Sequence, residues 1–252
     1  MPKLKTIVDF LDGELRIAEF DDSSNNGLQV ENPGQVRRIC CGVDASLAFF
    51  AEAHKRGADL VVCHHGISWG DSLKRITEIN YGRVSFLVRN DMALYACHLP
   101  LDAHPRHGNN ARICKALGLV QRRRFGLYRG SKIGYAGRLP RPMRYEAFKA
   151  LVARKIGGGV RCMDFGRKTV RTVAVVSGGA AAETAEAGRE GIDVYLSGEP
   201  ALEAYSLAQE YGINAVFAGH YATEVFGVRA LAAVLRRRFK IPVDFVDLEV
   251  PY

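Results

Sequence analysis

Two stretches of the sequence resemble each other and decide the fold: VRRICCGVDASLAFFAEAHKRGADLVVCHH at residues 36–65 and VRTVAVVSGGAAAETAEAGREGIDVYLSGE at residues 170–199. They align without a gap at a constant shift of 134 residues. Each contains an apolar strand-like run, a turn of small residues, an alanine-rich helix, a glycine and a second apolar run. This order predicts a β-α-β unit in each stretch. A chance likeness between two ordinary units of this kind is the alternative.

Local signals support the helices and strands of both units. Asp44 or Ser46 can cap the first helix, and Gly57 and Gly191 stand where a helix would end in left-handed backbone. The short apolar runs at 60–62 and 194–196 are typical of strands covered on both faces of a parallel sheet. A strand–helix–strand crossover of this size is expected to be parallel and right-handed.

The likeness continues along the chain with a new shift of 122 residues. LYACHLPLD at 94–102 lies over VFAGHYATE at 216–224, so that histidine meets histidine and an acidic residue meets an acidic residue. We therefore predict an α/β protein with two similar, intertwined lobes from an internal duplication, built on mixed, mostly parallel sheets flanked by helices. The lobes are expected at residues 1–124 and 125–252, and residues 125–165 are expected to form two strands and a helix that begins at Tyr145.

The composition is that of an ordinary globular protein. The chain has 252 residues, of which 48% are hydrophobic and 25% charged, and this excludes disorder as its main state. No apolar run approaches the roughly 18 residues of a membrane helix. Acidic residues at positions 9, 12 and 14 argue against a signal peptide. Six cysteines without a C-x-x-C pair argue against a zinc ribbon and indicate the reducing cytoplasm.

The net charge is positive. With 35 basic and 27 acidic residues it is +8, which favours anionic partners such as nucleotides, phosphates or nucleic acid. A solvated basic surface is the alternative. The clusters Arg122–Arg124 and Arg236–Arg238 fit the C-terminal ends of helices, where cations complement the helix dipole.

Residues that could carry chemistry stand where predicted strands end. These candidates are His64, His65, His98, Asp102, His220 and Glu224. Ligands gather at the carboxyl ends of strands in open α/β sheets, so we expect these side chains to form one cluster. His64 and His65 would face opposite sides of a straight strand, and Gly66 permits the bend that brings them together. A four-residue spacing places His220 and Glu224 on one face of a helix.

Imidazoles and carboxylates together suit Zn, Fe, Mn, Co or Ni rather than calcium. Six candidates exceed what one tetrahedral zinc ion needs. Two ions about 3.5–4 Å apart, bridged by a carboxylate and a water, would use them, and such a water becomes a nucleophile near neutral pH. A helix cap or a salt bridge is the alternative for each pair.

Two further segments attract attention. His104 and His107 lie in the polar segment DAHPRHGNN, where they are expected to contact substrate. The segment 25–29, NNGLQ, resembles a tight turn before a strand, and its spacing alone indicates a structural role.

Six motifs in this order resemble those of the NIF-three-like family, also described as GTP cyclohydrolase I type 2 homologues. They are SSNNGLQV (23–30), GADLVVCHHG (57–66), YACHLPLDAHPRHGNN (95–110), SGGA (177–180), DVYLSGE (193–199) and AGHYATE (218–224). The resemblance runs from about Asp22 to Val228. It implies a two-lobed α/β fold and a toroidal homohexamer, a trimer of dimers, with dinuclear metal sites facing an internal cavity.

The resemblance also implies roles for individual residues. The metal ligands are expected to be His64, His65, Asp102, His220 and Glu224, with the two carboxylates as the bridging ligands. His98 matches a position beside the metals and is assigned proton transfer. The leading hypothesis is a cytoplasmic, metal-dependent hydrolase of a nucleotide-like or other phosphorylated small molecule, with Lys74 or Arg106 holding the anion.

Two other functions fit the same residues. A basic ring could be a scaffold that binds single-stranded nucleic acid, with metals stabilising the assembly; such binding would weaken steeply with salt. The chain could instead store or deliver metal, in which case bound metal would transfer to an acceptor without turnover of any substrate.

Overall fold

The computed structural model describes residues 1–157 and 159–250, and the chain divides into two compact units. The first unit consists of Met1–Leu101 and Val228–Leu248, and the second of Asp102–Gly227 and Glu249–Tyr252. The chain passes from one unit to the other within helices α4 (Leu99–Ala103) and α9 (His220–Phe239). The sequence-based boundary after Arg124 falls inside strand β5 (Val120–Tyr128), which belongs wholly to the sheet of the second unit.

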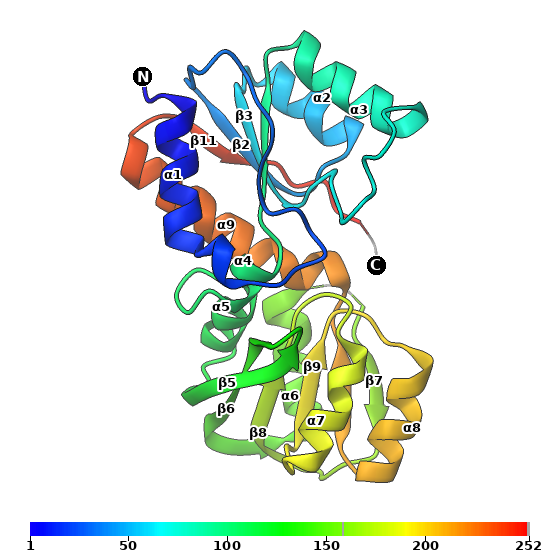
Figure 1. The fold of residues 1–252 in the computed structure, drawn as a ribbon. Coiled ribbons are helices and arrows are strands. Elements are labelled where there is room, and N and C mark those ends of the chain that lie inside the picture. The colour runs from blue at the N-terminus through cyan, green and yellow to red at the C-terminus, as the bar shows by residue number, and fades with distance from the viewer. Residues whose placement is uncertain (158, 251–252) are drawn as a thin grey trace. The chain divides into compact units, whose positions relative to one another are not determined.

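The first unit is built on a five-stranded sheet in the order β1-β4-β3-β2-β11 (Figure 1). Its strands are β1 (Gly27–Val30), β2 (Ile39–Asp44), β3 (Leu60–His65), β4 (Ala93–Ala96) and β11 (Val243–Phe245). All neighbours are parallel except β1, which pairs with β4 in the antiparallel direction. This sheet is mixed and mostly parallel, as predicted.

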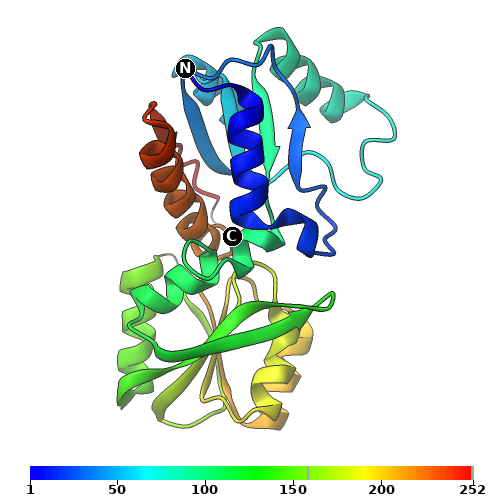
Figure 2. The ribbon, with the colours of Figure 1, turned by 60° about the vertical axis from the view of Figure 1, so that its left-hand side comes forward.

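Helices cover both faces of the first sheet (Figures 1 and 2). They are α1 (Leu4–Leu15), the short 3-10 helix η1 (Ile17–Glu19), α2 (Leu47–Lys55) and α3 (Glu78–Arg89). Of the two predicted caps, Asp44 and Ser46, it is Ser46 that caps α2, because its hydroxyl accepts a hydrogen bond from the amide of Phe49. Phe49 and Phe50 then bury their rings on one face of the sheet. On α1, Asp12 accepts a 2.8 Å hydrogen bond from the hydroxyl of Tyr95 in β4.

The second unit is built on a six-stranded sheet in the order β5-β6-β8-β9-β10-β7. Its other strands are β6 (Ser131–Arg144), β7 (Arg161–Asp164), β8 (Thr169–Val175), β9 (Val194–Ser197) and β10 (Asn214–Phe217). β8, β9 and β10 are parallel, whereas the other three pairings are antiparallel. The prediction of a mostly parallel sheet is wrong here. Arg129 and Gly130, both with positive φ, form a two-residue hairpin turn, which can only join antiparallel strands.

Five helical segments flank the second sheet. They are α5 (Asn109–Ala116), α6 (Tyr145–Ile156), the 3-10 helix η2 (Ala181–Glu183), α7 (Thr184–Arg189) and α8 (Leu202–Tyr211). α5 and α6 bury Ile113, Phe148 and Val152 against the side chains of β8, β9 and β10. α7 and α8 lie on the other face (Figure 1). α6 begins at Tyr145, as predicted.

The aligned stretches adopt the same element order in both units. β2, α2 and β3 occupy the first stretch, and β8, η2–α7 and β9 occupy the second. Gly57 and Gly191 follow the two helices with φ of 73° and 65°, so both are left-handed as predicted. The prediction for Arg122–Arg124 is wrong, since they lie in β5, whereas Arg236–Arg238 occupy the last turn of α9.

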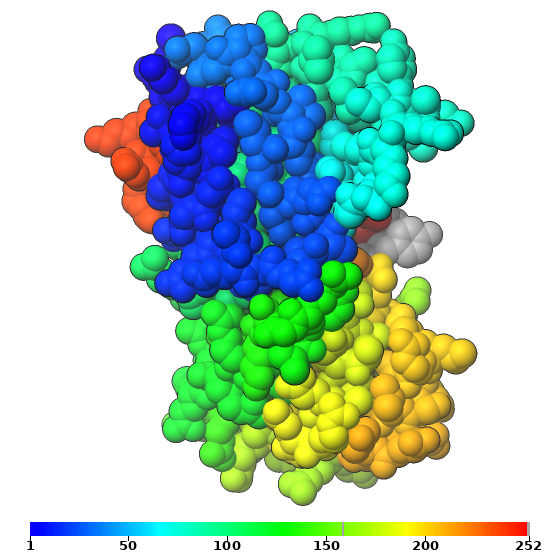
Figure 3. Space-filling model, viewed as in Figure 1, coloured from blue at the N-terminus to red at the C-terminus, as the bar shows by residue number. Residues whose placement is uncertain are grey.

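The segment that follows β3 is largely exposed to solvent. Gly66 and Ile67 are buried, whereas seven of the eight residues 70–77 are exposed on the outside of the first unit (cyan in Figure 3). Within the described parts of the chain, no helix has both the length and the apolar character needed to cross a bilayer.

Candidate metal centre

The carboxyl end of β3 brings two histidines together. The ring centroids of His64 and His65 lie 4.7 Å apart, although adjacent residues on a straight strand would diverge. His64 is fully buried and His65 is partly buried. Gly66, expected to permit a bend, is needed for space: a Cβ there would lie 2.3 Å from Oε1 of Gln29 and 2.5 Å from Cβ of Ala96.

His98 joins these two residues from the end of β4. Its ring centroid lies 5.2 Å from that of His64 and 5.7 Å from that of His65. One ligand atom from each of the three histidines lies within 4.8 Å of the others, close enough to surround a metal ion. The structure thus places three of the predicted side chains together within the first unit.

Asp22 orients His98. Its Oδ1 lies 2.9 Å from Nδ1 of His98, and its Oδ2 accepts hydrogen bonds from the amide of Leu99 and the side chain of Asn26. Burial acts to raise the pKa of the Asp22 carboxyl, but the hydrogen bonds and the positive charge of His98, together with Asn26 and the amide of Ser24, lower that pKa from 3.8 to about 2. Asp22 is therefore an anion at neutral pH.

The turn at residues 25–29 supports the same histidines. Oδ1 of Asn26 accepts a 2.8 Å hydrogen bond from the amide of His98. Oε1 of Gln29 accepts from the amides of Ile67 and Ser68, just beyond His65. A purely structural interpretation of this turn is therefore incomplete, because it positions the backbone on both sides of the histidine group.

The hydrogen bonds at Nδ1 settle which ring nitrogen can bind a metal. Nδ1 of His64 lies 2.9 Å from the carbonyl oxygen of Cys97, and Nδ1 of His65 lies 2.7 Å from Oδ1 of Asp44. A carbonyl oxygen and a carboxylate can only accept, so each Nδ1 carries a proton and each neutral ring has its lone pair on Nε2. Metal-binding histidines have this arrangement, in which an oxygen acceptor fixes the tautomer and raises the basicity of the ligand nitrogen.

A second group stands at the start of α9 in the second unit. Nδ1 of His220 lies 2.9 Å from Oε1 of Glu199, and its Nε2 lies 3.0 Å from Oε1 of Glu224. The spacing of four residues puts His220 and Glu224 on one helix face, as predicted. A neutral imidazole carries one proton and cannot donate to both carboxylates. With the ring proton on Nδ1, facing Glu199, a further proton or a metal ion is needed between Nε2 and Glu224.

Gly178 makes room for the buried Glu224. Its φ is +70°, and a Cβ there would lie 2.4 Å from Oε1 of Glu224 and 3.2 Å from Nε2 of His220. The hydroxyl of Thr223, one residue before Glu224, accepts a 3.0 Å hydrogen bond from the amide of Gly178. The glycine therefore leaves a space next to the two candidate ligand atoms that any side chain would fill.

Asp102 is held by side chains of the second unit. Its Oδ1 accepts hydrogen bonds of 2.8 Å from Asn109 and 2.9 Å from the hydroxyl of Ser177. Asp102 is buried, and the adjacent Asn110 is also buried and accepts a hydrogen bond from the amide of Ser177. These neutral donors fix the direction of the carboxylate without neutralising its charge.

The donor chemistry fits a divalent transition metal. Neutral imidazole nitrogens and carboxylate oxygens suit Zn, Fe, Mn, Co and Ni, whereas calcium prefers oxygen ligands alone. The acceptors at Nδ1, the paired carboxylates at His220 and the space at Gly178 are three observations of this structure that agree with binding of a divalent cation.

A comparison with family models decides the family. Residues 2–250 match the model of Duf34/NIF3 (NGG1p interacting factor 3). The chain belongs to the Duf34/NIF3 family. Curated NIF3 relatives agree with this assignment: the GTP cyclohydrolase 1 type 2 homolog of Deinococcus radiodurans is 44% identical over 96% of this chain and 91% of its own length. The homolog from Archaeoglobus fulgidus is 42% identical over 97% of this chain and 98% of its own length.

Solved structures of other proteins share the fold. Protein ybgI, described as a structural genomics target of unknown function, superposes with a TM-score of 0.93 at 33% identity and covers 99% of this chain and 100% of its own. TTHA1606 from Thermus thermophilus gives a TM-score of 0.88 at 34% identity, with 99% of this chain and 100% of its own covered. Reduced HcgD from Methanocaldococcus jannaschii gives 0.85 at 26% identity, with 98% of each chain covered.

The residues predicted to contact substrate in this NIF3 chain make only local contacts. Lys74 stands on the exposed segment 70–77, where it pairs with Asp71 at 2.7 Å. Nδ1 of His104 accepts hydrogen bonds from the amides of Arg106 and His107, and the rings of His104 and His107 stack at 4.9 Å. His104 therefore stabilises its own loop, and Arg106 is exposed.

Sequence reasoning missed four residues that surround the histidines of this NIF3 chain. They are Asp22, Asp44, Glu199 and Trp69. Asp44 and Glu199 could have been found, because both stand at the carboxyl ends of predicted strands, where ligands gather. Trp69, whose ring centroid lies 5.0 Å from that of His98, stands in a loop that carries no pattern pointing to it.

Proposed function

We propose that this NIF3 chain binds two divalent metal ions and hydrolyses a nucleotide-like or other phosphorylated small molecule. The proposed ligands are His64, His65, Asp102, His220 and Glu224. The observation that carries the proposal is the common arrangement at Nδ1 of His64, His65 and His220, where an oxygen acceptor fixes each ring with its Nε2 as the ligand atom.

Divalent ions at these residues would supply a water activated at neutral pH and positive charge that stabilises a phosphoryl transition state. The carboxylates of Asp102 and Glu224 would hold the ions and offset their positive charge. Asn109 and Ser177 hold Asp102 by neutral hydrogen bonds, so its full negative charge stays available to a cation. Gly178 preserves the space beside Glu224 that the cation requires.

His98 is the proposed proton-transfer residue. Its Nδ1 is hydrogen-bonded to the Asp22 anion, so the ring exchanges protons through Nε2. In the proposed reaction Nε2 takes a proton from the attacking water and returns it to the oxygen that leaves phosphorus. Asp22 holds the ring in one tautomer and stabilises the imidazolium that forms between these two steps.

The direct test combines metal analysis with a substrate panel. Protein purified without chelator is loaded with Zn, Mn, Fe, Co or Ni and assayed against phosphomonoesters, phosphodiesters, nucleotides and amides. We expect turnover of at least one phosphorylated compound, with loss of turnover in Glu224→Gln and retention in Glu203→Gln, a matched change on the exposed side of α8. Inactivity of every metal-loaded form against the whole panel would contradict the proposal.

The assay also separates the other two functions. Salt-sensitive binding of single-stranded nucleic acid that survives Glu224→Gln, without turnover, would favour a scaffold. Transfer of bound metal to an acceptor chelator without turnover would favour storage or delivery. Either result would replace the hydrolase proposal.

Further expectations follow from the family resemblance and the cysteines. We propose a homohexamer, a trimer of dimers, that acts in the cytoplasm, where the six reduced thiols of this chain would persist. We also infer that the shared order of β2, β3 and β4 with β8, β9 and β10 results from an internal duplication.

A further inference from the structure

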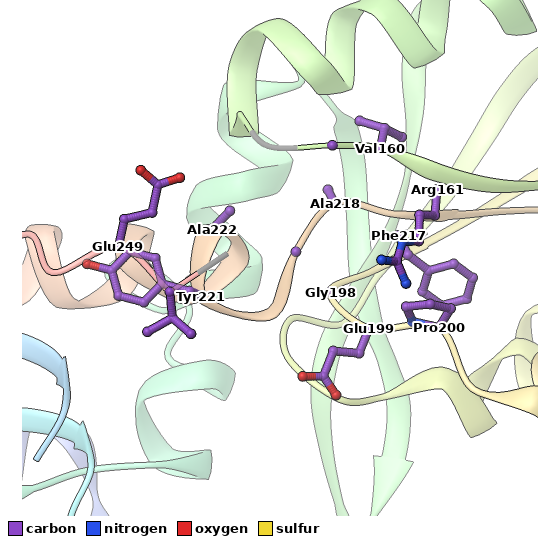
Figure 4. A pocket seen from close by; sticks show the side chains of 13 residues that line it. Val160, Arg161, Gly198, Glu199, Pro200, Phe217, Ala218, Tyr221, Ala222 and Glu249 are labelled. Atoms are coloured by element: carbon purple, nitrogen blue, oxygen red, sulfur yellow. The ribbon is translucent and has the colours of Figure 1, made fainter. Parts of the chain in front are cut away.

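The second unit contains a cavity that none of the proposed metal ligands lines. It has a volume of about 580 Å³ and lies beyond the carboxyl ends of β9 and β10 (Figure 4). This volume is within the range of roughly 300–1,000 Å³ that small-molecule pockets occupy. The position agrees with the rule that open α/β sheets bind ligands at the carboxyl ends of their strands.

The walls of the cavity are mainly apolar. Val160 comes from the segment before β7, Pro200 from the loop after β9, Phe217 from the end of β10 and Tyr221 from the start of α9. Figure 4 shows the Phe217 ring beside Pro200, with the side chain of Tyr221 on the opposite side of the view. Two aromatic rings and a proline suit a flat organic body better than a bare inorganic ion.

Arg161 provides the positive charge of this cavity. It is the first residue of β7, paired in register with Phe217, and its side chain is exposed. Within residues 1–157 and 159–250, no acidic side chain forms an ion pair with its guanidinium. A guanidinium in such a position can bind a carboxylate or phosphate oxygen through two parallel hydrogen bonds.

The cavity also contains negative charge, which limits the ligand. Glu199 and Glu249 line it together with Arg161. A polyphosphate would meet two carboxylates for each guanidinium, whereas a ligand with one anionic group and a neutral body could place that group at Arg161.

Glu199 links this cavity to a proposed metal ligand. Glu199 lines the cavity, and its Oε1 lies 2.9 Å from Nδ1 of His220. A molecule in the cavity therefore contacts the residue that orients His220. Binding in the cavity and binding of metal would influence each other through this carboxylate, and the effect would be reciprocal.

We infer that this cavity binds a mononucleotide-sized molecule with a planar, largely apolar body and one anionic group, and that Arg161 binds the anionic group. The inference rests on the proposed function, because it names the class of substrate or product that the hydrolase would hold. It replaces Lys74 and Arg106 as the residue expected to hold the anion.

Calorimetry with a charged and an uncharged probe tests the inference. Metal-loaded protein is titrated with GMP, AMP and UMP, and with guanosine as the probe that lacks the phosphate. At least one monophosphate should bind, and Arg161→Gln should weaken its binding about ten-fold, a modest loss for a charged contact because Arg161 is exposed. Guanosine binding should be the same in both proteins. Arg171→Gln, an exposed arginine on β8 outside the cavity, is the matched control and should change nothing.

A second variant fills the cavity. Ala222→Phe adds a ring at the start of α9, in the wall of the cavity, and should abolish binding of the phosphate probe and of guanosine alike. Circular dichroism and metal content confirm that this protein is folded. Absence of binding by every monophosphate, equal binding by wild type and Arg161→Gln, or undiminished binding by folded Ala222→Phe would each overturn the inference.

These outcomes are independent of the proposed hydrolysis. If the protein turned over a compound of the substrate panel but bound monophosphates equally well in Arg161→Gln, the cavity inference would be refuted and the proposed hydrolysis would stand. Binding that depends on Arg161 in a protein without turnover would refute the hydrolase and leave the cavity intact.

Discussion

Replacement of Glu199 by glutamine is expected to weaken metal binding at His220. The change keeps the size of the side chain and an oxygen that can accept from Nδ1 of His220, 2.9 Å away in the structure, but removes the negative charge. Because the Glu199 side chain is 47% exposed, water screens its charge, and we expect a loss of about 1.4 kcal/mol in the free energy of metal binding. This corresponds to about ten-fold in affinity, the lower end of the roughly 10- to 100-fold effect of such supporting residues.

A competition titration measures this effect. Metal-free protein and a chromophoric chelator of known affinity compete for Zn²⁺ at constant pH and ionic strength, and the absorbance gives the dissociation constant of each site. Glu203→Gln, the same change on the exposed surface of α8, should leave both constants unchanged. The assignment of His220 as a ligand would be refuted if Glu199→Gln and Glu224→Gln both bound Zn²⁺ within two-fold of the wild-type affinity.

Three further perturbations have expected outcomes. Gly178→Ala should destabilise the fold by about 1–3 kcal/mol in urea denaturation, because φ is +70° and the new Cβ would meet Oε1 of Glu224 at 2.4 Å, and equal stability would contradict this geometry. Asp22→Asn should lower the free energy of unfolding by about 2 kcal/mol at pH 7, because the pKa of Asp22 is about 2 in the folded protein and 3.8 ordinarily. The ionised carboxylate therefore stabilises the fold above pH 4, and this stabilisation disappears as the pH falls through 2. A difference in stability between wild type and variant that persists at pH 2 would contradict the lowered pKa. The fluorescence of Trp69, the one tryptophan of the chain, should be quenched on addition of Co²⁺, since its ring centroid lies 5.0 Å from that of His98; unchanged emission at saturating Co²⁺, or equal quenching in His65→Ala, would argue against a metal at this group.

The local elements of the fold were accessible from the sequence because their signals are local. Ser46 caps α2 and Gly57 ends it through interactions within a few residues. The pairing of β11 with β2 was not accessible, since it joins residues about 200 positions apart. The antiparallel pairing of β7 with β10 also joins distant residues, and no local sequence signal predicts it.

The candidate site divides in the same way. The histidines that follow apolar runs could be predicted, because the end of a strand can be recognised in the sequence. Their acceptors did not: Asp22 reaches His98 from 76 positions away, and the carbonyl of Cys97 that fixes His64 is a backbone atom with no sequence signature. The space at Gly178 depends on a left-handed φ and on the approach of Glu224 from α9, which only the folded chain shows.

Metal content per chain tests the central claim most directly. Protein purified without chelator, reconstituted with Zn²⁺ or Mn²⁺ and passed through a desalting column, is measured by inductively coupled plasma mass spectrometry beside the His65→Ala and Glu224→Gln variants. The account predicts about two ions per chain in the wild type and a loss of at least one in each variant. A wild type that retains no transition metal, or variants that retain as much as the wild type, would contradict it.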